Sequence, residues 1–164
     1  MKFFGAFLLT TAGLASGFLA ARLGYARLAL CRSLCQMLRL ISFQLERFLT
    51  PLPELFASLT GQVSGGAETL CAAVAAGLEE PGESFSSIWG RALEALPGEE
   101  REILLPLGQV LGRYGAAEQI AAVTAALRDM TALADALGGQ LREKSRGYIG
   151  LATAGGAMLA VLLL

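Results

Sequence analysis

The sequence contains no histidine, only three cysteines among its 164 residues, and only 16% charged residues. Histidine is the most common general base in enzymes and a frequent metal ligand, so its absence removes the usual basis for both kinds of site. Three cysteines neither form a disulfide framework nor supply the four ligands of a thiolate zinc site. Ordinary soluble domains are roughly 25% charged. The low charge, with a mean hydropathy of +0.56, therefore indicates a membrane protein.

Catalytic and nucleic-acid-binding patterns are also missing. The net charge of −1 leaves no basic footprint for a nucleic acid, and the sequence has no phosphate-binding loop, nucleophile elbow or zinc-protease motif. The acidic clusters, Glu79 with Glu80 and Glu99, Glu100 with Glu102, fall at expected helix ends, where carboxylates are usually solvated or complement the helix dipole. We therefore expect no enzyme, and no catalytic, cofactor-binding or metal-binding residue.

Both ends of the chain lack charged residues. Residues 3–21 and 147–164 contain no Asp, Glu, Lys or Arg. At the helical rise of 1.5 Å per residue each segment would be about 27 Å long, close to the ~30 Å hydrocarbon core of a bilayer. We predict two transmembrane helices, 3–21 and 147–164, with residues 22–146 as a separate domain between them.

The basic residues that flank these segments predict the orientation. Three arginines follow the first segment and three basic residues precede the second, namely Arg22, Arg27, Arg32, Arg142, Lys144 and Arg146, against Lys2 alone at the amino terminus. Because basic flanks are retained in the cytoplasm, residues 22–146 are expected to be cytoplasmic, in a protein of the cell membrane. A cleaved signal peptide is the alternative for the N-terminal segment.

Small residues recur at four-residue spacing in both segments. Gly13 and Gly17 form a G-x-x-x-G pair, and Gly156 lies midway between Ala152 and Ala160. Such faces let two helices approach closely, so we expect packing within the chain or between copies. The alternative is that Gly and Ala are simply frequent in this chain.

The central segment is predicted to be all-α. The apolar positions Cys31, Leu34, Leu38, Ile41, Leu45 and Phe48 alternate spacings of three and four, as on one face of a helix that continues the first span. Thr50 as N-cap and Pro51 at the first helical position predict a new helix over 51–59. Further short helices are expected over 67–78 and from the Ser84 cap through Trp89 to Leu93. Another should begin at Pro97 and Gly98, kink at Pro106 and end at Gly112 or Gly115.

The last helix carries two apolar heptad positions, Ile120, Leu127, Ala134 and Leu141 at one and Val123, Met130 and Leu137 at the other. This seam is expected to pack antiparallel on the first helix within one chain; an intermolecular coiled coil is the alternative. Cys31 and Cys35 are interpreted as buried small apolar residues. Trp89 is favoured as a core residue over an exposed anchor for a partner. The predicted fold is a cytoplasmic antiparallel helical bundle between an N-terminal and a C-terminal transmembrane helix.

Several short sequence patterns, taken together, resemble one known family. They are Thr50-Pro51-Leu52-Pro53-Glu54-Leu55, Gly82-Glu83-Ser84 with Trp89 and Ala92-Leu93, Glu100-Arg101-Glu102-Ile103-Leu104-Leu105, Leu107-Gly108 with Leu111-Gly112, and Gln119, followed by Lys144 and Tyr148 before a glycine-rich segment. Each pattern is weak alone, but their order and spacing along essentially the whole chain resemble the stage III sporulation protein AB family.

The resemblance implies a function. Members of that family belong to a secretion-like channel between mother cell and forespore, and they are similar to platform protein F of type II secretion and type IV pilus machines. It therefore implies a non-enzymatic membrane platform in the mother-cell membrane facing the forespore, required for endospore formation. Its implied partners are the lipid membrane, a cytoplasmic motor ATPase and sibling channel proteins, with a homo-oligomer as a further candidate. The alternative from another class is a small two-span membrane adaptor or regulatory subunit unrelated to secretion.

The sequence departs from the family pattern at two places. Gln44 and Arg47 stand where an acidic and an aromatic residue are common, and Tyr114 and Gly115 stand where a Ser-Asp pair commonly precedes the last helix. The cap of that helix must therefore come from another residue. These departures leave the fold unchanged but remove the support for a contact surface centred there.

Overall fold

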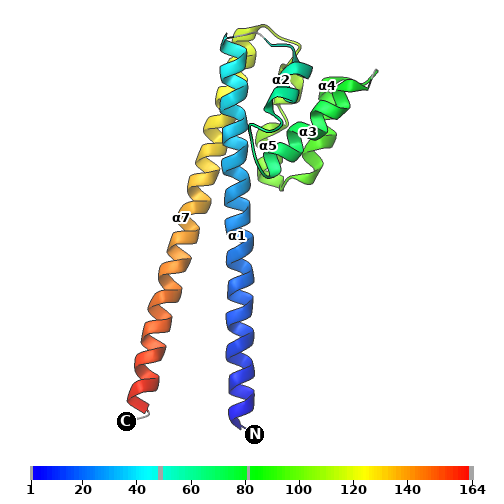
Figure 1. The fold of residues 1–164 in the computed structure, drawn as a ribbon. Helices are drawn as coiled ribbons and strands as arrows, with labels where there is room; N and C mark the ends of the chain where they lie inside the picture. The colour runs from blue at the N-terminus through cyan, green and yellow to red at the C-terminus, as the bar shows by residue number, and fades with distance from the viewer. Residues whose placement is uncertain (1, 48–49, 81, 163–164) are drawn as a thin grey trace. The chain divides into compact units, whose positions relative to one another are not determined.

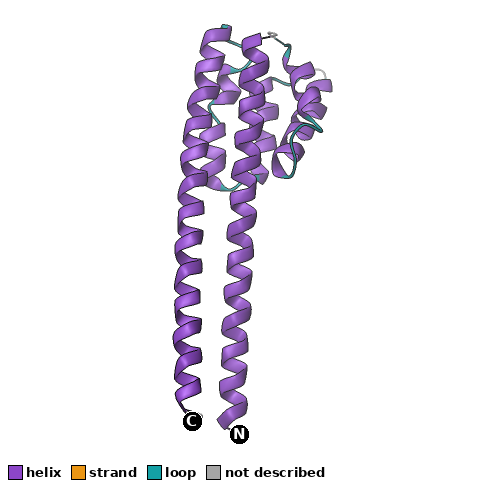
Figure 2. Ribbon diagram, turned by 60° about the vertical axis from the view of Figure 1, so that its left-hand side comes forward, coloured by secondary structure: helices purple, strands orange, loops and turns teal. Residues whose placement is uncertain are grey.

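The computed structural model describes residues 2–47, 50–80 and 82–162, and the side chains of residues 22–47, 50–80 and 82–143. The described residues are helical apart from short connections and one isolated bridge between Thr60 and Val63, which confirms the all-α prediction. The elements are α1 (Lys2–Arg47), α2 (Leu52–Leu59), α3 (Gly66–Glu79), α4 (Phe85–Ala92), the 3-10 helix η1 (Leu93–Ala95), α5 (Gly98–Leu104), α6 (Leu107–Val110) and α7 (Ala116–Leu162) (Figure 1). Figure 2 shows the same elements from a second direction.

The chain divides into two compact units. One contains Met1–Leu28 and Asp135–Leu164, and the other is Ala29–Ala134. The second unit is the helical bundle, in which residues 29–47 of α1 run antiparallel to residues 116–134 of α7 (Figures 1 and 2). A hydrogen bond between Cys35 Sγ and Thr131 Oγ1, 3.7 Å long, joins these two arms. The intrachain packing preferred from the sequence is therefore present.

The buried face of α1 follows the predicted pattern. Leu34, Leu38 and Ile41 are fully buried, and Leu45 and Cys31 are buried with them. Met37 and Cys35, which lie beside that seam, are buried too. Residues 29–47 of α1 therefore bury more than one narrow face, because helices of the bundle pack on more than one side. Phe48 lies outside the described residues.

The predicted seam of α7 needs a correction. Val123, Met130 and Ala134 are buried, but Leu127 is only half-buried, and the buried position beside it is Ala126. The buried spacings are therefore three, four and four rather than a strict alternation of three and four. A straight helix with 3.6 residues per turn drifts away from a heptad repeat, and a short contact does not impose the supercoil that would correct the drift.

The starts and stops of the short helices agree with the sequence to within one residue, with two corrections. The N-cap of α2 is Pro51 and not Thr50. Pro51 has a ψ of 144° and forms no side-chain cap, and the helix begins with Leu52 and Pro53. A proline costs nothing in the first helical turn, where N–H groups have no intrahelical partner. The helix expected to kink at Pro106 is instead two helices, α5 and α6, separated there.

The predicted membrane spans lie outside what the structure describes in full. Side chains of residues 3–21 and 147–164 are not described, so the packing predicted at Gly13, Gly17 and Gly156 lies outside the region whose side chains the structure describes. Among the described residues, no helix combines the length and the apolarity needed to cross a membrane.

Candidate functional site

Trp89, the central residue of the sequence pattern, is part of the core. Its side chain is fully buried and its indole Nε1 donates a hydrogen bond of 2.8 Å to the carbonyl oxygen of Leu104. The ring centroid lies 5.8 Å from that of Phe56 and 5.7 Å from that of Phe85. Buried aromatic clusters of this kind contribute both apolar burial and ring–ring attraction. Trp89 therefore holds α2, α4 and α5 together. This confirms the prediction that it is a core residue and not an exposed anchor for a partner.

The residues of the Leu107 to Gly112 pattern pack around that cluster. Leu107 and Leu111 are buried, and Gly108 lies against the indole. A Cβ added at Gly108 would lie 2.7 Å from Trp89 Cδ1, so only glycine lets α6 approach the ring this closely. Gly112, in the turn after α6, adopts a φ of +78°, which favours glycine.

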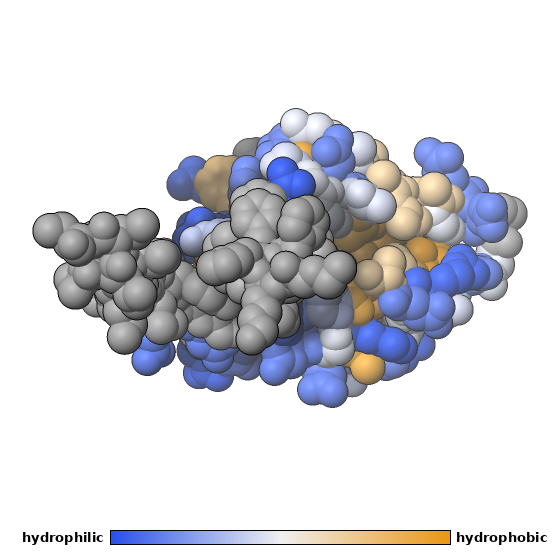
Figure 3. Space-filling view, turned by 90° about the horizontal axis from the view of Figure 1, so that it is seen from below, coloured by the Kyte–Doolittle hydropathy of each residue, from blue (hydrophilic) through white to orange (hydrophobic). Residues whose placement is uncertain are grey.

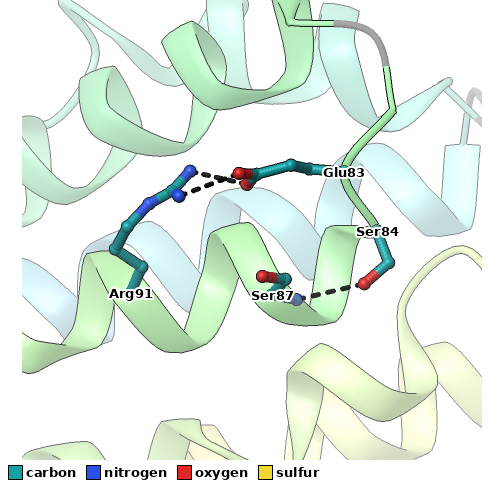
Figure 4. A network of polar contacts seen from close by, with 4 residues as sticks. All are labelled: Glu83, Ser84, Ser87 and Arg91. Carbon is teal, nitrogen blue, oxygen red and sulfur yellow. Dashed lines mark hydrogen bonds and ion pairs between the residues drawn. The ribbon is translucent and has the colours of Figure 1, made fainter.

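The Gly82-Glu83-Ser84 pattern forms the start of α4 (Figure 4). Gly82 has a φ of +110°. Ser84 is the N-cap, as predicted, and its Oγ accepts a hydrogen bond of 3.3 Å from the backbone N–H of Ser87. Glu83 accepts two hydrogen bonds from the guanidinium of Arg91, at 3.0 and 2.7 Å. These bonds and the positive charge of Arg91 lower the pKa of the Glu83 carboxyl, although both side chains are exposed.

Gln119 holds the turn that precedes α7 but does not cap the helix, because its side chain donates a hydrogen bond there and does not accept one. Its Nε2 donates a hydrogen bond of 2.6 Å to the carbonyl oxygen of Tyr114, and its backbone N–H donates to the carbonyl oxygen of Gly115 at 3.1 Å. The side chain thus fixes the turn where the Ser-Asp pair is absent. Gln44 forms a contact between α1 and α2, because its Nε2 donates to Ser58 Oγ at 2.9 Å. The described residues of the sequence pattern, from Pro51 and Pro53 to Gln119, therefore contribute to packing, to helix ends or to turns.

Glu100 lies in the first turn of α5, where a carboxylate complements the helix dipole, as expected. It is not solvated, however, because its side chain is fully buried and accepts a hydrogen bond of 3.2 Å from Cys31 Sγ. A buried carboxylate requires polar partners. Glu100 and Leu104, one turn apart on the same face of α5, are both buried.

The cysteines are buried and unpaired in disulfides. Cys31 and Cys35 were expected as buried residues and are confirmed, although their thiols also make the polar contacts described above. Burial raises the pKa of the Cys71 thiol to about 12, so this thiol stays protonated and unreactive at neutral pH. Among the described side chains, no group of three His, Cys, Asp or Glu could hold a metal ion.

Two grooves open on the surface of the bundle. The first, here called the α3–α4 groove, has a volume of about 490 Å³ and is mainly apolar; it is lined by Leu30, Gly66, Thr69, Leu70, Ala73, Ile88, Arg91, Ala92, Ala95 and Leu96. Seen from below, the bundle exposes apolar residues with hydrophilic residues around them (Figure 3). The second, of about 470 Å³, lies between α5 and α7 and carries three carboxylates, with Glu99, Glu102, Ile103, Pro106, Asp129 and Leu133 as its lining.

Charge is unevenly distributed along the domain. Residues 22–47 contain five basic residues and one acidic residue, whereas residues 48–134 contain four basic and eleven acidic residues. The surface contributed by α2 to α6 and the start of α7 is therefore acidic. An acidic surface with apolar grooves favours binding of basic, partly apolar partners.

Sequence reasoning missed both grooves. The signal for the α3–α4 groove was present in the small residues at Gly66, Thr69 and Ala73, which recur with helical spacing. Pattern analysis assigns such positions to a helix but does not say which faces remain uncovered. The groove lies between segments that are brought together only by the fold.

Comparisons with known proteins agree with the architecture. The family model for stage III sporulation protein AB matches residues 2–164. A solved structure described as stage III sporulation protein AB (SpoIIIAB) superimposes with a TM-score of 0.65 at 21% sequence identity, over 71% of this chain and 97% of that chain. At this identity the superposition demonstrates similarity of fold. A comparison with curated proteins finds no match.

Proposed function

The chain belongs to the stage III sporulation protein AB family, and from this premise we propose that it is a non-enzymatic membrane platform of a secretion-like channel between mother cell and forespore. Its bundle would bind a cytoplasmic motor ATPase and sibling channel proteins. Its two uncharged ends, 3–21 and 147–164, would cross the mother-cell membrane that faces the forespore.

One observation supports docking over chemistry. Most of the described residues of the sequence pattern pack within the bundle or lie at the ends of its helices, whereas the surface of the bundle carries grooves and an excess of carboxylates. A protein that assembles others needs such surfaces and no catalytic constellation. The alternative, a two-span adaptor unrelated to secretion, requires the same topology but different neighbours.

Crosslinking in sporulating cells tests the proposal. A photoreactive amino acid would replace Ala73 in the α3–α4 groove or Leu133 in the α5–α7 groove of the full-length chain, with exposed Glu54 of α2 as the control position. Capture of the motor ATPase or of sibling channel proteins from a groove position, and not from position 54, is the expected result. Capture only of proteins unrelated to the channel would favour the adaptor.

The proposed topology has its own test. Ser64 is exposed between α2 and α3, so a cysteine at this position should react with a membrane-impermeant maleimide only when the cytoplasmic side is open. The native thiols Cys31, Cys35 and Cys71 are buried and should give a low background. Labelling of intact cells from outside would contradict the proposed orientation.

A further inference from the structure

We propose that the α3–α4 groove binds an amphipathic helix of a partner protein, with an apolar stripe that enters the groove and basic residues beside that stripe. This inference specifies the chemistry of a partner for the platform proposed above, and to that extent it rests on the proposed function. Three observations support the partner helix: the shape of the groove, the small residues that line it and the charges near Arg91.

The groove has the shape that a helix requires. From α3 it is lined by Gly66, Thr69, Leu70 and Ala73, which follow the spacing i, i+3, i+4, i+7 and thus share one face. The opposite wall, formed by α4 and the residues after it, repeats this spacing with Ile88, Arg91, Ala92, Ala95 and Leu96. A face of α3 of about two turns, or roughly 10 Å, and the segment from α4 through η1 to Leu96 flank a trough of about 490 Å³, which Leu30 of α1 also lines.

The small residues of the lining leave room for a third helix. Ala73 and Ala95 are exposed, one on each wall, and neither side chain reaches across the trough. At the Gly77 end of α3 the two walls are held together, because a Cβ at Gly77 would lie 2.5 Å from Cγ2 of Ile88 in α4. The walls are therefore fixed relative to each other, and an apolar helix face can lie between them, as in other complexes where such a face occupies a groove.

The charge on the α4 wall selects a basic partner. Arg91 lines the groove, but its guanidinium is bound by the carboxylate of Glu83, and Glu80 and Glu94 also act on it electrostatically. These three carboxylates do not line the groove themselves, but with one guanidinium among them the region around Arg91 is negative overall. Lysine or arginine residues beside the apolar stripe of the partner would complement it.

The same charges argue against a lipid surface as the occupant. Anionic headgroups attract basic segments and are repelled by carboxylates. The three carboxylates would therefore disfavour an anionic membrane at this groove. A basic amphipathic helix satisfies both the apolar trough and the negative wall.

A binding experiment with designed peptides tests the proposal without the channel. The full-length chain would be inserted in nanodiscs of zwitterionic phosphatidylcholine, with empty nanodiscs as background. The probe is a fluorescein-labelled helical peptide of about five turns with a leucine stripe flanked by lysines. Two matched peptides carry glutamate in place of each lysine, or the same residues in scrambled order. Fluorescence anisotropy should show that the lysine peptide binds about tenfold or more tightly than either.

Substitutions in the chain locate the site. Ala73→Trp and Ala95→Trp each fill the trough from an exposed position and should weaken binding of the lysine peptide about tenfold. Ala125→Trp on the exposed face of α7 is the matched control and should bind as wild type. Circular dichroism would establish that each variant is folded.

Charge reversal tests the negative wall. Glu80→Lys with Glu94→Lys should weaken binding of the lysine peptide and strengthen binding of the glutamate peptide, whereas Glu54→Lys with Glu118→Lys should change neither. Equal binding of the three peptides, or wild-type binding by both folded tryptophan variants, would overturn the proposal.

Two other occupants give distinct results. Binding of the wild-type chain to added anionic vesicles that Ala73→Trp abolishes would identify a lipid surface, and self-association that Ala73→Trp abolishes would identify a second copy. Either result would refute the partner helix. The peptide experiment requires no channel component, so its failure would not affect the crosslinking test of the platform. Failure of the crosslinking test would likewise leave the peptide result unaffected.

Discussion

At the scale of single residues, the structure explains why several positions of the family pattern are glycine, tryptophan or leucine. Trp89 is the only tryptophan in the chain, and it is enclosed by Phe56, Phe85 and the backbone of Gly108. Interiors are packed as densely as organic crystals, so one added methyl group must displace a neighbour. The pattern was recognisable in the sequence, but its role in packing was visible only in the fold.

Gly108→Ala is expected to destabilise the bundle by about 1 to 3 kcal/mol, because the added Cβ would lie 2.7 Å from Trp89 Cδ1 and the indole is held on its other sides. Gly90→Ala is the matched control: nothing lies within 4 Å of its added Cβ, and alanine in a helix should stabilise by up to about 1 kcal/mol. Urea unfolding followed by circular dichroism measures both. Equal stability of the two variants would mean that Trp89 moves freely to accommodate the methyl group.

At the scale of the helices, stability depends on how each short element starts. α4 has only eight residues, too few to persist alone, so its N-cap and its packing decide whether it forms. Ser84 supplies the cap, and Trp89 and Ile88 supply the buried face. The exposed ion pair between Glu83 and Arg91 adds little, since solvent screens it.

Ser84→Ala should lower the free energy of unfolding by about 1 kcal/mol, because the backbone N–H of Ser87 loses its side-chain acceptor. Glu83→Gln should cost much less. The pKa of Glu83 is lowered in the folded state, so its small stabilisation is present above the unfolded pKa and lost as pH falls through the folded pKa. Unfolding curves at neutral and acidic pH test this prediction. If Glu83→Gln lowered the free energy of unfolding more at acidic than at neutral pH, the stabilising role of the ionised Glu83 would be refuted.

The boundary between α1 and α2 gives a second prediction. Pro51→Ala should change the free energy of unfolding by less than about 1 kcal/mol, because Pro51 lies outside the helical residues of α2. Leu45→Pro should cost about 3 kcal/mol or more, since it interrupts α1 at a buried residue. Leu45→Ala separates loss of the side chain from loss of the helix. Equal tolerance of Pro51→Ala and Leu45→Pro would place the boundary elsewhere.

At the scale of the molecule, Ala29–Ala134 forms a compact unit of its own, with the core that α1 and α7 enclose together with the short helices. Each arm supplies only one side of that core. The arms therefore need the helices between them, and an isolated coiled coil of α1 with α7 would leave much of α1 exposed.

A fragment of residues 28–144, without both predicted spans, should fold as a monomeric helical bundle. Leu38→Ala in this fragment should cost 2 to 5 kcal/mol, because Leu38 is fully buried. The midpoint of thermal unfolding should not depend on protein concentration, since the seam is closed within the chain. Melts over a hundredfold dilution measure this, and a midpoint that falls steadily on dilution would support the intermolecular coiled coil instead.

Local sequence determined most of the helices and their boundaries, apart from the N-cap of α2 and the separation of α5 from α6 at Pro106. Proline, glycine and capping residues act within a few positions, so Ser84, Pro97 and Gly112 marked starts and stops before the fold was known. Apolar spacing likewise identified the buried face of α1. The uncharged ends and the family pattern were also legible without a structure.

Tertiary structure alone decided which residues of polar type are buried and which apolar faces remain uncovered by other segments of the chain. Glu100 is buried because Cys31, 69 positions away, lies against it, and Ala126 replaces Leu127 in the seam because a straight helix drifts from the heptad. The α3–α4 groove exists because Leu30, Ala73 and Ala95 meet from three segments without covering one another. Local patterns are set by neighbouring residues, whereas burial and grooves are set by contacts between residues far apart in the chain.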